Sequence, residues 1–72
     1  LAYPLEMHAV RILWLMEDWQ NDGSDPLDIE VYQGVILHDG NHRLMAAMFR
    51  GDGVVYAEVG GMMDEAREYG LI

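Results

Sequence analysis

The sequence predicts a small α+β domain with about three helices and a three-stranded sheet. Helical periodicity appears in separate segments, polar and apolar residues alternate between them, and Gly or Asp-Gly turns divide these stretches. With 72 residues there is room for one compact domain, residues 1–72, and none for a second core. The chain contains no cysteine, so neither a disulfide framework nor a thiolate nucleophile is expected.

Residues 5–20 form the first predicted helix, with Pro4 suited to its start. At 100° per residue one face is apolar and is expected to pack on the core: Leu5, Ala9, Ile12, Leu13, Met16 and Trp19. A second apolar set lies on the other side: Met7, Val10 and Trp14. Two interpretations stay open for it. Either the C-terminal segment of the chain covers it, or it is a partner or homodimer surface, because Trp is frequent at interface hot spots.

A polar loop at 21–26 leads into the predicted sheet. Residues 28–32 alternate polar and apolar, which is typical of a half-buried strand. Gln33-Gly34 forms a turn, and the apolar run 35–37 fits a central strand. A third strand is expected at 54–59, before a break at Gly60-Gly61.

Two further helices are predicted around that third strand. The first covers residues 41–50 and ends at Gly51 in a left-handed cap. The last covers residues 62–69, with Asp64 and Glu65 in its first turn and Gly70 as its stop. We expect the first and last helices to pack on the sheet.

The charge is unusual: thirteen Asp and Glu face four Arg and no Lys, a net charge of −9. Binding of nucleic acid depends on cationic side chains that neutralise phosphates, so this composition argues against direct contact with nucleic acid or with an anionic membrane. No apolar run approaches the roughly 18 residues of a membrane span. Basic protein surfaces are the expected partners, and the cytoplasm is the expected location.

The acidic residues form two groups in the sequence. The first lies in the loop and first strand, and the second lies in the last helix: Asp22, Asp25, Asp28 and Glu30, then Asp64, Glu65 and Glu68. Together with Trp14 they are the predicted partner-binding residues. Whether the two groups share one face is a question for the structure.

The stretch from Val35 to Ala47 carries the most chemistry. A strand runs through a Gly turn into a helix, whose first N–H groups lack intrahelical partners and can bind an anion. Gly40 permits close approach, and Arg43 can bind a phosphate or a carboxylate. A simpler hypothesis is that Arg43 pairs with one of the thirteen carboxylates. His38 and His42 are four residues apart, but Gly40 interrupts the helix that a shared metal would need, so no metal site is expected.

The run Asp39-Gly40-Asn41-His42-Arg43, followed by Ala46-Ala47 and Gly51, resembles the ParB/sulfiredoxin-like superfamily. The resemblance covers residues 5–59. It implies a small α/β core and a phosphate-binding or nucleotide-binding turn at Gly40, Asn41, His42 and Arg43. Asn41 stands where sulfiredoxin has its catalytic Cys, which excludes that reductase chemistry. The further nucleotide motif and the DNA-binding helical domain of ParB-type CTPases are both absent from the sequence.

Two hypotheses about function follow. The first is a small, acidic, non-catalytic protein-binding module without a cofactor, such as a phage or mobile-element inhibitor of the anti-CRISPR or anti-restriction type. Its carboxylates would imitate DNA phosphates on a basic nucleic-acid-binding surface. The alternative is a ParB-like module that binds a nucleotide or another phosphate at the Gly-Asn-His-Arg turn, with or without nucleotidase or nuclease activity.

Overall fold

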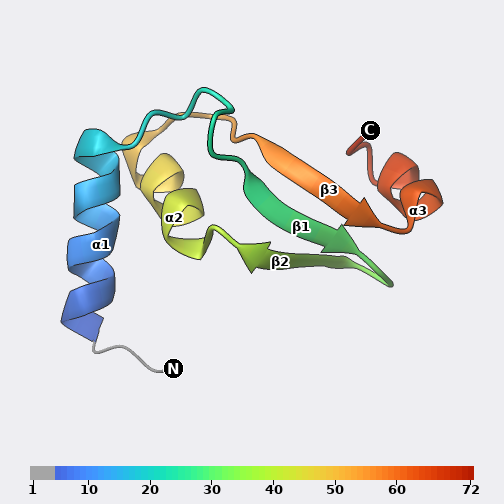
Figure 1. Ribbon diagram of the computed structural model, residues 1–72, viewed down its shortest axis with the longest axis horizontal. Coiled ribbons are helices and arrows are strands. Elements are labelled where there is room, and N and C mark those ends of the chain that lie inside the picture. The colour runs from blue at the N-terminus through green and yellow to red at the C-terminus, as the bar shows by residue number, and fades with distance from the viewer. Residues whose placement is uncertain (1–4) are drawn as a thin grey trace.

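Six elements make up the chain in this computed structural model, which describes residues 5–72 (Figure 1). Pro4, the predicted helix start, lies outside the described residues. The order is α1 (Leu5–Asp18), β1 (Leu27–Val31), β2 (Val35–Asp39), α2 (Asn41–Arg50), β3 (Ala57–Gly61) and α3 (Met63–Glu68). The predicted α+β class, with a three-stranded sheet and three helices, is confirmed.

The sheet has the strand order β2-β1-β3, with β1 antiparallel to β2 and parallel to β3. The expected central position of residues 35–37 is therefore wrong, because β2 is an edge strand and β1 is central. A hairpin connects β1 to β2, and α2 then carries the chain to the opposite edge of β1. A β-bulge interrupts the β1–β2 pairing between Asp28 and Ile29.

The third strand begins and ends later than the alternating sequence predicts. β3 covers Ala57–Gly61, so the expected break at Gly60-Gly61 lies inside the strand. The segment 54–56 spans the distance from α2 to the free edge of β1, where the N–H of Leu27 donates to the carbonyl of Tyr56 (2.9 Å). Pairing with β1 therefore decides the strand limits, and the hydrophobicity of Val54 and Val55 does not.

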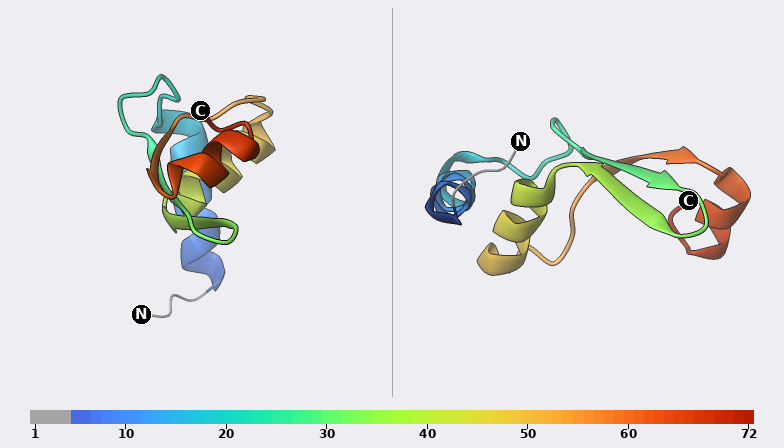
Figure 2. Two further views of the ribbon diagram at one scale, coloured as in Figure 1. Left: turned by 90° about the vertical axis from the view of Figure 1, so that its right-hand side faces the viewer. Right: turned by 90° about the horizontal axis from the view of Figure 1, so that it is seen from below.

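The two ends of the sheet carry different helices (Figure 1). α1 packs mainly against α2, so the expectation that it packs on the sheet is wrong. α3 contacts β1 and β3 at the other end, as expected. In Figure 2 (right) the same separation is seen from below, with α1 and α3 at opposite extremes. The expectation that the C-terminal segment covers α1 is therefore wrong.

The face that α1 turns to α2 differs in part from the predicted one. Ile12, Met16 and Trp19 of the predicted stripe are partly buried, as expected. Leu15, outside that stripe, is buried, while Leu5 and Leu13 within it are 85% and 60% exposed. The helix has apolar residues on nearly every side, so periodicity alone does not identify the packed side.

The buried core is small for a domain of this length: Leu15, Leu27, Val31, Ala46, Ala47 and Ala66, with the side chain of Arg43 among them. The caps that end the two later helices are as predicted. Gly51 is left-handed (φ 78°) and donates to the carbonyls of Ala47 and Met48, and Gly70 is left-handed (φ 77°) after α3. Because the chain buries little surface, the glycine caps contribute to holding its short helices.

Candidate functional site

The predicted turn connects β2 directly to α2. Asp39 ends the strand, Gly40 adopts a left-handed conformation (φ 111°), and Asn41 begins the helix. A Cβ at residue 40 would collide with the side chain of Leu27, so both the backbone angle and the space require glycine. Gly40 provides no side-chain cap, which leaves the first N–H groups of α2 without a side-chain acceptor from the N-cap residue.

Arg43 points from the first turn of α2 into the protein. Its Nη1 donates to the carbonyls of Asp25 (2.7 Å) and Pro26 (3.0 Å) and lies 2.8 Å from Oδ1 of Asp25. Its Nη2 lies 3.3 Å from Oδ2 of Asp39. The hypothesis that Arg43 pairs with carboxylates is confirmed. The guanidinium holds α2 against the loop before β1, and its side chain is only 11% exposed.

His42, next to Arg43, is hydrogen-bonded to a histidine of α1. Nδ1 of His8 and Nε2 of His42 are 2.7 Å apart, and the ring centroids are 5.0 Å apart. One ring donates a hydrogen bond to the other, so the tautomers of the two rings are linked. The predicted anion-binding residue His42 therefore joins α2 to α1.

A cleft of about 680 Å³ lies between α1 and the turn. It brings all four predicted phosphate-binding residues together with residues of α1 and the following loop. Its ionised lining residues are Arg11, Arg43, Asp18, Asp25 and Asp39. Carboxylates outnumber guanidinium groups there, and Arg43 is already paired with two of them. The lining is therefore unfavourable for a phosphate, which needs cations that are not already neutralised.

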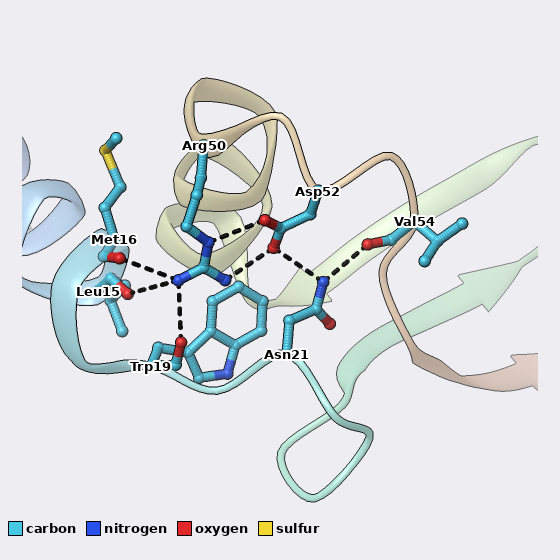
Figure 3. A network of polar contacts seen from close by, with 7 residues as sticks. All are labelled: Leu15, Met16, Trp19, Asn21, Arg50, Asp52 and Val54. Atoms are coloured by element: carbon cyan, nitrogen blue, oxygen red, sulfur yellow. Dashed lines mark hydrogen bonds and ion pairs between the residues drawn. The ribbon is translucent and has the colours of Figure 1, made fainter.

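A second network, which the sequence did not predict, connects the C-terminal end of α1 to α2 (Figure 3). Nη1 of Arg50 donates to the carbonyls of Met16 (3.0 Å) and Trp19 (2.9 Å) and contacts that of Leu15 (3.4 Å). The carbonyl of Leu15 also accepts from the N–H of Trp19 (3.0 Å), and all three carbonyls lie at the C-terminal end of α1 or just beyond it, so a guanidinium from another helix caps α1.

Asp52 orients this guanidinium through a two-point ion pair. Its Oδ1 accepts from Nε of Arg50 (2.9 Å) and its Oδ2 accepts from Nη2 (2.7 Å). Asn21 also donates to Oδ2 (3.1 Å) and bonds the carbonyl of Val54 (2.7 Å). The hydrogen bonds from Arg50, and then from Asn21, lower the pKa of Asp52 from its ordinary 3.8, and the pair raises the pKa of Arg50. The only sequence signal was an Arg next to a helix-ending Gly51-Asp52.

The two predicted acidic groups are spread along β1. Asp22 and Asp25 precede the strand, Asp28 and Glu30 lie within it, and α3, with Asp64, Glu65 and Glu68, lies beyond its far end (Figure 1). Asp22 and Asp25 are therefore not in one cluster with the acidic residues of α3. In the first group, Ser24 donates side-chain and backbone hydrogen bonds to Asp22, which lower the pKa of that carboxyl.

An acidic row crosses all three strands. Asp28 on β1 lies opposite Asp39 on β2 and beside Glu58 on β3. Glu30 follows on β1, and its carboxylate is 3.5 Å from Nε2 of His38. Neither Asp28 nor Glu58 has an ion-pair partner within residues 5–72. Glu58 was missed because only strand pairing brings it beside Asp28.

The third predicted feature is the outer face of α1. Met7, Val10 and Trp14 are all more than half exposed, and Arg11 stacks over the indole of Trp14 at 5.0 Å. Trp14 is 51% exposed and also borders the cleft between α1 and the turn, and its role in binding a partner stays a prediction.

No group of three His, Asp or Glu side chains in residues 5–72 is arranged to hold a metal ion. None of the helices in that part of the chain has the length and apolar character needed to cross a membrane. Comparison with known proteins found no matching family model, curated protein or solved structure. The resemblance to the ParB/sulfiredoxin-like superfamily therefore stays a prediction from the motif.

Proposed function

We propose that this chain is a non-catalytic protein-binding domain whose acidic surface engages a basic surface of a nucleic-acid-binding protein in the cytoplasm. The observation that carries the proposal is the acidic row, in which Asp39 is paired with Arg43, whereas Asp28 and Glu58, neighbours on β1 and β3, have no ion-pair partner within residues 5–72. Like charges side by side destabilise a sheet, so the fold bears a cost at this position. A cationic partner would remove that repulsion.

The placement of the arginines supports the same proposal. Arg43 binds Asp25 and Asp39, Arg50 binds Asp52, and Arg67 lies 3.5 Å from Asp64. Three of the four cations are thereby neutralised by carboxylates of the chain itself. Nine further carboxylates have no Arg partner in residues 5–72, and their field favours fast association with a positive surface. Inhibitors of nucleic-acid-binding complexes encoded by phages or mobile elements are one class of protein that uses such a surface.

Affinity capture tests the proposal. The wild-type chain is immobilised, bound proteins are identified by mass spectrometry, and duplex DNA is added as a competitor. We expect a basic DNA-binding or RNA-binding protein to be captured, to be released by DNA, and to bind more weakly as salt is raised.

Charge-reversal variants locate the binding surface. The double variant Asp28→Lys and Glu58→Lys is expected to abolish capture. The matched control, the double variant Asp64→Lys and Glu68→Lys on α3, reverses the same number of charges at the other end of the sheet and is expected to retain capture. Capture that is unchanged by the double variant, or that DNA does not affect, would contradict the proposal.

The alternative function, phosphate or nucleotide binding, is favoured by one observation: the cleft of about 680 Å³ contains Gly40, Asn41, His42 and Arg43. The engagement of Arg43 by Asp25 and Asp39 opposes it. Calorimetry with CTP, ATP and GTP distinguishes the two functions. Saturable binding that Asn41→Asp weakens would favour the alternative, and the absence of heat at millimolar nucleotide would end it.

A further inference from the structure

α1 is apolar on two opposite sides but packs on only one of them. Leu15 is 4% exposed against α2, while on the outer side Met7, Val10, Leu13 and Trp14 are 53%, 65%, 60% and 51% exposed. A helix that is apolar all round is normally buried on all sides. Four large apolar side chains within about two turns form a continuous exposed stripe, hereafter the outer face of α1, and a stripe of this kind marks an interaction surface.

The whole chain exposes more surface than a compact monomer of its size. Its accessible area is 5368 Å², against about 4,500 Å² expected for 8.2 kDa. Its radius of gyration is 13.4 Å, against about 11 Å expected for 72 residues. The excess area is comparable to the roughly 800 Å² that each partner buries in a standard-sized interface.

We propose that the outer face of α1 packs against the same face of a second copy of this chain. A two-fold axis near Val10 would place Met7 of one copy against Trp14 of the other, an isologous pairing of self-complementary surfaces. Trp14, the largest of these side chains, is the expected hot spot.

Charge argues against the basic partner at this face. The charged residue stacked on Trp14 is Arg11, which would repel a basic surface. Arg11 has no ion-pair partner within residues 5–72, so no carboxylate of the described residues neutralises it. The acidic row of the sheet stays available for the partner, so the dimer does not depend on the proposed function.

Salt dependence separates the two interactions. Each copy carries a net charge of −9, so the copies repel each other and added salt weakens that repulsion. We expect sedimentation equilibrium to give twice the 8.2 kDa chain mass, with tighter association in high salt. Added salt is expected instead to weaken the binding of a basic partner. A chain that sediments as a monomer at every salt concentration would overturn the dimer and leave the proposed function untouched.

Substitutions locate the interface. Trp14→Glu and Val10→Glu are each expected to weaken dimerisation by roughly tenfold or more. The matched control is Phe49→Glu on α2, where the wild-type side chain is 67% exposed and the added charge is the same. Circular dichroism confirms that each variant is folded. Dissociation by Phe49→Glu without dissociation by either α1 variant would place the interface elsewhere and refute the proposal.

A cross-linking measurement is independent of destabilising changes. The chain has no native cysteine, so Val10→Cys provides a single thiol next to the proposed axis. A short bismaleimide is expected to join two copies of Val10→Cys and not two copies of Phe49→Cys. Equal cross-linking of both variants would contradict the interface.

Discussion

At the end of the molecule where α1 packs on α2, hereafter the helical end, the guanidinium groups of Arg43 and Arg50 bind main-chain carbonyls and join α2 to its neighbours. At the other end, where α3 packs on the strands (hereafter the sheet end), Val31 is fully buried and its carbonyl accepts from the N–H of Met62 (2.7 Å). Ala66 of α3 is also fully buried. The helical end therefore depends on ionised side chains, and the sheet end depends on close backbone packing. A chain with so small a core uses hydrogen-bonded charges where apolar contacts are few.

The largest effect is expected at the sheet end, from Gly61→Ala. Gly61 is left-handed (φ 90°), and an added Cβ would collide with the main chain of Val31. We expect the free energy of unfolding to fall by about 3 kcal/mol, because backbone strain and a steric clash add. Urea denaturation measures it. Gly53→Ala, with a similar φ of 83° and open space around the site, is the control and is expected to cost about 1 kcal/mol. Equal losses would mean that close packing does not limit this end.

The next effect is expected at the helical end, from Arg43→Ala. This change leaves the carbonyls of Asp25 and Pro26 without their donor and is expected to cost about 2 kcal/mol of stability. Thermal and urea unfolding measure the loss. The control is Arg67→Ala, an exposed pair with Asp64 whose removal is expected to cost less than about 0.5 kcal/mol. A similar loss in both variants would show that Arg43 does not stabilise the packing of α2 against the loop before β1.

Acid should loosen the helical end through Asp52. Its pKa in the fold lies below the ordinary 3.8, so the stabilisation by its pairing with Arg50 is complete above that value. The stabilisation is lost as the pH falls through the lowered pKa of the folded state.

Asp52→Asn tests this dependence. The variant is expected to be less stable than the wild type at neutral pH, with a smaller further loss on acidification. Unfolding curves at neutral and acidic pH measure the difference, and Asp64→Asn on α3 is the comparison variant. Parallel pH profiles of wild type and Asp52→Asn would refute the role of the pair.

The smallest effect is expected in the acidic row. Asp28→Asn removes a carboxylate that lies beside Glu58 on the next strand and opposite Asp39. The loss of this repulsion should raise the free energy of unfolding by about 0.5 kcal/mol at low salt. The gain should disappear at high ionic strength, where the repulsion is screened. Glu68→Gln on α3 is the control and should not change stability in this way. A destabilised Asp28→Asn variant would show that the row does not repel.

The local elements were predictable from the sequence because their signals are local. α2 covers the predicted 41–50, and its Gly51 cap follows from the position of a glycine after an amphipathic segment. The hairpin turn at Gln33-Gly34 and the stop at Gly70 follow from the same backbone requirement, since both glycines have positive φ. The surplus of carboxylates likewise follows from composition alone.

Other features depended on contacts between distant residues. Strand pairing places β1 in the centre of the sheet and brings Asp28 beside Asp39 and Glu58. The packing of α1 on α2 depends on contacts between two helices that are distant in the sequence. The sequence did not determine that Arg43 points inward, because an arginine in a first helical turn can face either a bound anion or another loop of the protein. The capping role of Arg50 could not be predicted, since its carbonyl acceptors are 31 to 35 residues away.

The sequence by itself determined the α+β class, the helix ends at glycines, the Asp-Gly-Asn-His-Arg turn and the net charge of −9. The tertiary structure decided which side of α1 is buried, that Arg43 binds carboxylates and carbonyls of the chain, and that Asp22 and Asp25 lie at the opposite end of β1 from α3. The physical reason is the range of the interactions. Backbone conformation and composition are properties of short segments, whereas burial and charge pairing depend on which segments meet in space.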